Sequence, residues 1–269
     1  MKIAVITLSK EGTKVAAKLA ASWKECDVFV HASVPPGGET QPADVLPPVQ
    51  RFDHIVELTE RIFGLYQGLV YVAPSGAVVR AIAPCLRHKT VDPAVVVVDV
   101  AARWAVSLLG GHEGGANELA LAAANVLGAE PVISTTTEAV KNLIVGVGCR
   151  RGAAAEAIVA AVRAAMALAG SELGRVRLMA SAEIKASEPG LREAAKELGL
   201  PLRLIPDEEI RHTARTFSRS DFVQEKVDLP AVAEPVALLA GRRTQLILPK
   251  RVFPNVTVAI ARENCSSLE

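Results

Sequence analysis

A histidine and a glutamate, His112 and Glu113, stand between two pairs of glycines in the stretch SLLGGHEGGANELA. An imidazole titrates near neutral pH, and a neighbouring carboxylate orients it or activates water, so this pair suits general acid–base catalysis. Flanking glycines let the backbone adopt positive φ angles and approach a ligand closely. The helix predicted to start at Asn117 offers unpaired N–H groups that favour a carboxylate or an oxyanion. We interpret the stretch as a binding and catalytic turn.

Two other interpretations of this turn are open. In the first, His112 and Glu113 are solvated loop residues without a role in chemistry. In the second they bind zinc, but the sequence has neither HExxH nor a histidine pair four residues apart, and the other histidines lie far away in the chain. We therefore expect no metal site.

Two turns that follow other predicted strands also carry reactive side chains. Ser75, before Gly76, is either a helix cap or a ligand contact. Cys149 is either a nucleophile, with a pKa lowered by a helix N-terminus and two neighbouring arginines, or a small residue in a tight turn. Those arginines, Arg150 and Arg151, have planar forks that match a carboxylate.

A further polar turn, residues 181–188, follows a predicted strand without any glycine. Its charged residues either pair with one another on the surface or take part in a site, because ligands of open α/β sheets bind beyond the carboxyl ends of the strands. The charged residues are Glu183, Lys185 and Glu188.

Apolar strands that alternate with helices position these turns and predict an α/β protein with mainly parallel sheets covered on both faces. We expect two doubly wound domains, residues 1–138 and 143–269, with a cleft between them at the carboxyl ends of both sheets. Loops are expected at 33–49 and 212–230. The predicted strands are residues 1–7, 27–31, 68–72, 95–98, 105–109, 131–134, 143–147, 176–180, 202–205, 244–248 and 256–261, and the predicted helices are residues 13–23, 49–63, 77–83, 117–127, 153–169, 189–198, 207–211 and 234–239.

Composition restricts the class of protein. Half of the 269 residues are hydrophobic but only 4% are aromatic, which predicts an aliphatic core. The 30 basic and 29 acidic residues nearly balance, so we expect no nucleic-acid partner. Four scattered cysteines and the lack of a signal peptide indicate a reducing cytoplasm, and no apolar run is long enough to span a bilayer.

Several long strings together resemble the cobalt-precorrin-5A hydrolase (CbiG) family of anaerobic cobalamin biosynthesis. They run through nearly the whole chain in the order of the family. Longer members have a middle segment that is absent here, where residues 134–138 pass almost directly into Leu143. The strings are PSGAVVRAIAP, TVDPAVVVVD and SLLGGHEGGANELA in the first half, and VGVGCRRG, AEIKASEPGLREAAKELGLPLRL, EPVALLAG, LILPK and VTVAIAR in the second.

The resemblance implies a substrate, a cobalt-containing methylated tetrapyrrole with a fused δ-lactone and many carboxylates. Water opens the lactone, and a two-carbon unit leaves as acetaldehyde. His112 or Glu113 is the candidate base, and the candidates for moving a proton during carbon–carbon cleavage are Glu118, Glu183 and Lys185. The implied substrate-binding residues are Ser75, Gly76, Arg80, Gly111, Gly114, Gly115, Asn117, Cys149, Arg150, Arg151 and Glu188, of which Gly114 and Gly115 supply N–H groups to the oxyanion.

The same resemblance implies no dissociable cofactor, because the cobalt belongs to the substrate. Other enzymes of the cobalamin pathway are possible partners, a membrane is not, and the apolar composition is compatible with a homodimer. Two functions from other classes stay open: a carrier that binds the corrinoid intermediate without converting it, and a chelatase-like metal inserter. The inserter requires clustered histidines, which the sequence lacks.

Overall fold

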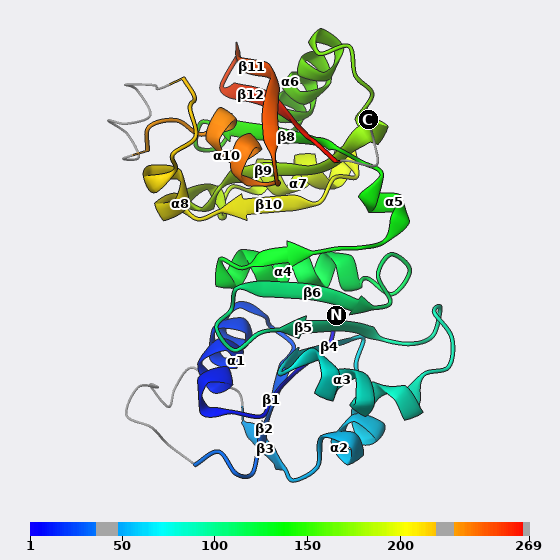
Figure 1. Cartoon of the computed structure of the whole chain (residues 1–269). Helices are drawn as coiled ribbons and strands as arrows, with labels where there is room; N and C mark the ends of the chain where they lie inside the picture. The colour runs from blue at the N-terminus through cyan, green and yellow to red at the C-terminus, as the bar shows by residue number, and fades with distance from the viewer. Residues whose placement is uncertain (36–47, 219–228, 266–269) are drawn as a thin grey trace. The chain divides into compact units, whose positions relative to one another are not determined.

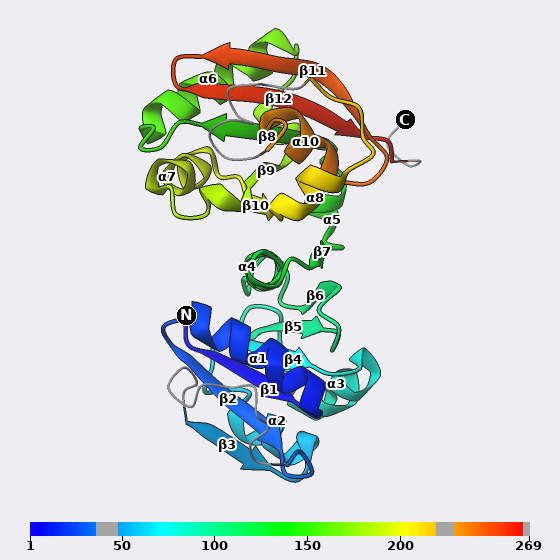
Figure 2. The same cartoon turned by 90° about the vertical axis from the view of Figure 1, so that its left-hand side faces the viewer.

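The computed structural model describes residues 1–35, 48–218 and 229–265, so the two predicted loops lie partly outside it. The chain divides into two compact units, Met1–Thr135 and Thr136–Glu269, which are drawn in Figures 1 and 2 and are treated separately below. In the described part of the chain, no helix combines the length and the apolar character needed to cross a membrane.

Unit 1 contains a seven-stranded sheet in the order β3-β2-β1-β4-β5-β6-β7. Apolar residues that alternate along its central strands fill two cores, so that α1 and α4 cover one face and α2 and α3 the other (Figure 1). The strands are β1 (Ile3–Thr7), β2 (Cys26–His31), β3 (Val49–Phe52), β4 (Gly68–Val72), β5 (Ala94–Val98), β6 (Trp104–Leu109) and β7 (Glu130–Val132), and the helices are α1 (Lys10–Ser22), α2 (Ile55–Ile62), α3 (Ser75–Ile82), the 3₁₀ turn η1 (Ala83–Cys85) and α4 (Ala116–Leu127).

The first five strands of this sheet are parallel, as predicted, but β6 runs antiparallel to β5. Only residues 99–103 join the two strands, and a parallel crossover needs a dozen or more. The side chain of Asp99 closes this hairpin by accepting hydrogen bonds from the N–H groups of Arg103 (2.7 Å) and Trp104 (2.9 Å). The short connection therefore reverses the direction of β6.

The predicted helix at 49–63 is wrong in its first turn. Residues Val49–Phe52 form β3, which pairs in parallel with β2, and α2 begins only at Ile55. Phe52 turns into the core beside α2, whereas the three residues before it are exposed. Pairing with a neighbouring strand thus overrides the local helical pattern.

Unit 2 contains a five-stranded sheet in the order β10-β9-β8-β12-β11, shown in Figure 2. Strands β8, β9 and β10 are parallel, whereas β12 and β11 are antiparallel additions. Its two cores place α6 and α7 on one face and α8 and α10 on the other. The strands are β8 (Leu143–Cys149), β9 (Val176–Ala182), β10 (Leu202–Ile205), β11 (Thr244–Phe253) and β12 (Val256–Glu263), and the helical segments are α5 (Thr136–Ala139), α6 (Ala155–Leu168), η2 (Leu173–Arg175), η3 (Glu183–Lys185), α7 (Pro189–Leu198), α8 (Asp207–His212) and α10 (Ala233–Leu239).

Strand β11 is twice as long as the predicted 244–248, because it continues into a hairpin with β12. Its register shifts between Leu248 and Arg251, around Pro249. Proline has no N–H to donate to a ladder, which is why the strand bulges there.

Candidate functional site

Unit 2 has a pocket of about 660 Å³ at the carboxyl ends of β8 and β9. Its walls are the turn after β8, the η3 turn after β9, the start of α10 and the β11–β12 hairpin. Four of its lining residues are cationic and one is a carboxylate, and the others are apolar residues together with three uncharged polar ones. The charged residues are Arg150, Arg151, Lys185, Lys250 and Glu188. An excess of positive charge beside apolar surface suits a ligand that combines carboxylates with an apolar body.

Glu188 connects two walls of this pocket. Its Oε2 accepts a hydrogen bond of 2.9 Å from the N–H of Gly152, and its Oε1 lies 3.6 Å from the Nζ of Lys185. Both side chains are largely buried, with exposed fractions of 11% for Glu188 and 13% for Lys185. Gly152 has a φ of +71°, which favours glycine, so the turn after β8 depends on this residue type.

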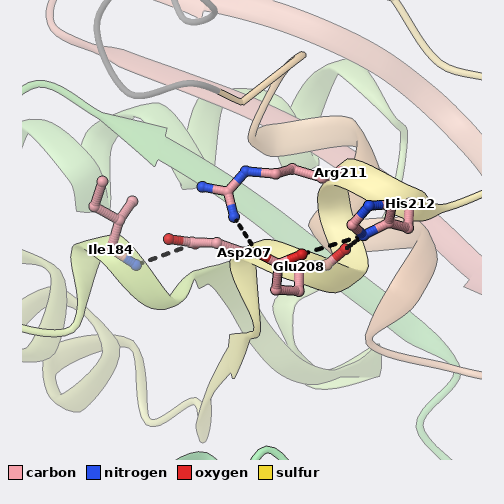
Figure 3. Close-up of polar contacts among 5 residues, drawn as sticks. All are labelled: Ile184, Asp207, Glu208, Arg211 and His212. Carbon is pink, nitrogen blue, oxygen red and sulfur yellow. Dashed lines mark hydrogen bonds and ion pairs between the residues drawn. The ribbon is translucent and has the colours of Figure 1, made fainter.

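The η3 turn is held from its other side by α8, as Figure 3 shows. The N–H of Ile184 donates a hydrogen bond of 3.3 Å to Oδ1 of Asp207, the first residue of α8. Glu208, the next residue, pairs with Arg211 at 2.8 Å, and its carboxylate lies 3.2 Å from Nδ1 of His212. The same Nδ1 lies 3.0 Å from the carbonyl oxygen of Glu208, so the imidazole is tied to the surface of α8.

Cys149 lies at the end of β8 and lines the pocket, but its predicted activation is wrong. Burial raises the pKa of its thiol, Glu188 raises it further, and Lys185 opposes them only in part. The helix expected to lower the pKa begins six residues later, at Ala155. The thiol therefore stays protonated near neutral pH and is a poor nucleophile.

Sequence reasoning missed the wall that the β11–β12 hairpin contributes. Lys250 lines the pocket from the bulge of β11, and its backbone N–H donates a hydrogen bond of 2.8 Å to Oε1 of the buried Glu234. Beyond the bulge, Val252 and Phe253 add apolar surface to the wall. Pro249, directly after the predicted strand 244–248, was the sequence signal that could have indicated this bulge. Glu183, by contrast, is exposed and does not line the pocket.

In unit 1 the turn after β6 presents His112 and Glu113 to solvent. Oε1 of Glu113 lies 2.8 Å from Nζ of Lys89, and this bond, opposed by some desolvation, lowers the pKa of the carboxyl group. Glu113 is therefore a weaker proton acceptor than an ordinary glutamate. The imidazole of His112 makes no hydrogen bond with the residues that the structure describes, and Glu118 is exposed on the first turn of α4.

The N–H of Gly114 is bonded within this turn, which corrects its predicted role as an oxyanion donor. The N–H groups of Gly114 and Ala116 both donate to the carbonyl of Gly110, at 3.0 and 3.1 Å. Gly115 has a φ of +84°, and a methyl group on Gly114 would lie 2.9 Å from the oxygen of Gly110. The glycines thus make the turn possible, but the Gly114 N–H is already used.

Asn117, predicted to bind substrate, is buried and tied to the protein. Its Oδ1 accepts a hydrogen bond of 2.8 Å from Ser107, and its Nδ2 donates one of 3.0 Å to Thr135. Its N–H donates to the carbonyl of Gly111, where a side chain would collide with Thr135. Asn117 and Gly111 therefore hold the turn against β6 and the end of unit 1.

The turn after β4 does not join the His112 turn. In the register of the sheet, Val72 lies beside Val98, the last residue of β5, whereas Leu109 lies opposite Val95 near its start. The two turns therefore lie at opposite edges of the sheet, about 10 Å apart along β5. The expectation of one shared edge is wrong because β6 is antiparallel.

The residues of the β4 turn have local roles in the structure. Pro74 is the N-cap of α3 and Ser75 is its first residue, so Ser75 is not the cap that was predicted. Arg80 donates a hydrogen bond of 3.1 Å to the carbonyl of Gly76 within the same helix. Among the described residues no group of three or more histidines, cysteines or acidic residues is arranged to hold a metal ion.

Comparison with known proteins identifies relatives of both halves of the chain. Family models described as "Cobalamin synthesis G N-terminal" and "Cobalamin synthesis G C-terminus" match residues 57–138 and 143–261. Cobalt-precorrin-5A hydrolase of Priestia megaterium is 38% identical over 141 residues, which are 52% of this chain and 36% of that protein. The protein of the same name from Salmonella typhimurium is 46% identical over 76 residues, 28% of this chain and 22% of that one. Protein CobE of Sinorhizobium sp is 35% identical over 128 residues, 47% of this chain and 83% of CobE. The matched segments thus cover only 36% and 22% of the length of these two hydrolases.

Proposed function

This chain belongs to the cobalamin synthesis G family, and we propose that it is a cobalt-precorrin-5A hydrolase. Water adds to the carbonyl of the substrate's δ-lactone and the ester C–O bond breaks, leaving a carboxylate and a hydroxyl group. That hydroxyl then loses its proton and becomes the carbonyl of acetaldehyde. The electron pair of the broken carbon–carbon bond enters the macrocycle, which takes up a proton, so the product is cobalt-precorrin-5B.

The pocket of unit 2 is the observation that carries this proposal. A tetrapyrrole offers a flat apolar ring edged by carboxylates, and the pocket offers apolar side chains edged by cationic ones. Arg151 and Lys250 come from different walls, so they can bind carboxylates on different sides of a macrocycle. Val252 and Phe253 supply apolar contact on the hairpin side. We assign substrate binding to this pocket.

We assign water activation to His112. An imidazole nitrogen can accept a proton from water, whereas the Lys89 ammonium lowers the pKa of the Glu113 carboxyl and so weakens it as a base. Glu113 then serves to keep Lys89 in place beside the turn. Protonation of the macrocycle falls to Glu118, Glu183 or Lys185, of which only Lys185 lines the pocket.

The proposal includes the setting of the reaction. The cobalt is part of the substrate, so the protein needs no dissociable cofactor. The partners are the tetrapyrrole itself and other enzymes of its pathway, and the cysteines, free in the described residues, fit a reducing cytoplasm.

Anaerobic incubation with cobalt-precorrin-5A tests the function directly. We expect volatile aldehyde to accumulate in step with a matching loss of mass from the corrinoid. The variant Arg151→Gln should weaken substrate binding and raise KM, whereas Arg192→Gln, on α7 and outside the pocket lining, should behave like the wild type. Tight binding with unchanged corrinoid mass would instead identify a carrier, and the hydrolase proposal would be wrong.

A further inference from the structure

Lys185 is a cation in the pocket whose hydrogen bonds are unused. Its side chain is 13% exposed, and its Nζ lies 3.6 Å from Oε1 of Glu188, beyond hydrogen-bonding distance. With the residues that the structure describes it forms no hydrogen bond. An ammonium group has three donors, and Lys185 lines the pocket without a hydrogen-bond acceptor for any of them among the described residues. A ligand in the pocket can supply the acceptors.

Glu188 serves two separate purposes with its two oxygen atoms. Oε2 accepts the N–H of Gly152 at 2.9 Å and so fixes the turn that carries Arg150 and Arg151. Oε1 faces Lys185 and supplies only its charge. This negative charge lies in the wall of the pocket, where it repels any carboxylate that approaches Lys185.

We propose that Lys185 binds a carboxylate of the ligand and that Glu188 is its resident counter-ion, which weakens that binding while holding the neighbouring turn. The inference rests on the proposed function for the identity of the ligand as a polycarboxylate tetrapyrrole. It reverses the expectation that Glu188 itself binds substrate. It also predicts that removing the negative charge of the buried Glu188 improves ligand binding. A purely structural role of Glu188 would not produce that improvement.

The variant Glu188→Gln separates the two purposes. A glutamine side chain keeps a carbonyl oxygen that can accept the Gly152 N–H, but it removes the charge beside Lys185. The variant Glu188→Ala removes both the acceptor oxygen and the charge. Glu193→Gln is the matched control, because it deletes the same charge at an exposed position of α7 that does not line the pocket.

The probe is uroporphyrin, a tetrapyrrole with carboxylates on every pyrrole ring, titrated into the full chain while its fluorescence is recorded. We expect Glu188→Gln to bind it about fivefold more tightly than the wild type, and Glu193→Gln to leave Kd unchanged. Glu188→Ala should bind less tightly than Glu188→Gln because its turn is no longer held. Uroporphyrin should also raise the Tm of Glu188→Gln by more than that of the wild type.

A double-mutant cycle with Lys185→Met assigns the effect to this lysine. In the Lys185→Met background, Glu188→Gln should no longer tighten binding. Equal binding by wild type and Glu188→Gln, no binding by either, or tightening that persists without Lys185 would overturn the inference. Acetaldehyde release by the wild type is measured separately, so a failure of the hydrolase proposal is distinguishable from a failure of this assignment.

Discussion

At the scale of single residues, the structure separates side chains that are available for chemistry from those already committed to the fold. Asn117, Gly111 and Gly114 are committed to the turn after β6. His112 and Lys185 keep unused hydrogen-bonding capacity among the described residues. Hydrogen-bond partners therefore discriminate between candidates that residue type alone treats as equal.

His112→Ala should lower the rate of acetaldehyde release about tenfold or more, because it removes the proposed general base. The assay is the anaerobic incubation with cobalt-precorrin-5A. His212→Ala is the control, since His212 is an exposed histidine paired with Glu208 on α8. A near-wild-type rate for His112→Ala would remove this residue from the mechanism.

Cys149 should react slowly with iodoacetamide at pH 7 and faster as the pH rises above its ordinary pKa. Burial raises the pKa of this thiol, so at a given pH less of it is the reactive thiolate than in a free peptide. Mass spectrometry of the peptide that contains it measures the rate. Cys149→Ala should retain acetaldehyde release within about threefold, since we assign the thiol no covalent step. Rapid alkylation at pH 7 together with an inactive alanine variant would restore the nucleophile hypothesis.

At the scale of elements, close backbone approaches fix the walls of the unit 2 pocket. A methyl group on Gly146 of β8 would overlap the carbonyl oxygen of Ala233, where α10 begins. A methyl group on Gly190 of α7 would likewise overlap the carbonyl oxygen of Ala153. These glycines are needed because helix and strand backbones pass too closely for a side chain.

Gly146→Ala should lower the free energy of unfolding by about 2 kcal/mol or more, because α10 must move away from β8 to make room. Chemical denaturation measures the change. Gly174→Ala is the control, since a methyl group on this glycine of η2 meets nothing within 4 Å and should change stability by less than about 0.5 kcal/mol. Equal stabilities of the two variants would contradict the packing that we describe.

At the scale of the whole molecule, each unit is built to fold by itself. Each has its own sheet with apolar cores on both faces, and the cores of one unit contain no residue of the other. The match to CobE covers 83% of CobE but only 47% of this chain. A relative of this length indicates that a protein about half as long as this chain can stand alone.

Residues 136–269, expressed alone, should therefore unfold in a single cooperative transition and bind uroporphyrin through their pocket. Circular dichroism during denaturation and the fluorescence titration test the two parts of this prediction. Residues 1–135 are the matched fragment, which should fold without binding the probe at the unit 2 affinity. A fragment 136–269 that is unfolded in isolation would show that its stability depends on unit 1.

The sequence by itself determined the order and type of most elements, because apolar periodicity and turn residues are local signals. Helix α7 and strand β10 have the predicted limits, set by Pro189 at the start of the helix and Gly199 after its end. The α/β class follows from the alternation of apolar strands with helices along the chain. The local helical pattern failed at β3, where a partner strand distant in sequence decided the conformation.

Only the tertiary structure decided which of these elements run antiparallel and hence which turns share an edge of a sheet. The direction of β6 depends on its pairing with β5, and it moved the His112 turn away from Ser75. The pKa of Cys149 depends on burial, which reversed the sign expected from its neighbours in the chain. Lys185 and Lys250 lie 65 positions apart in sequence, and only the folding of η3 and the β11–β12 hairpin around one pocket brings them to the same site.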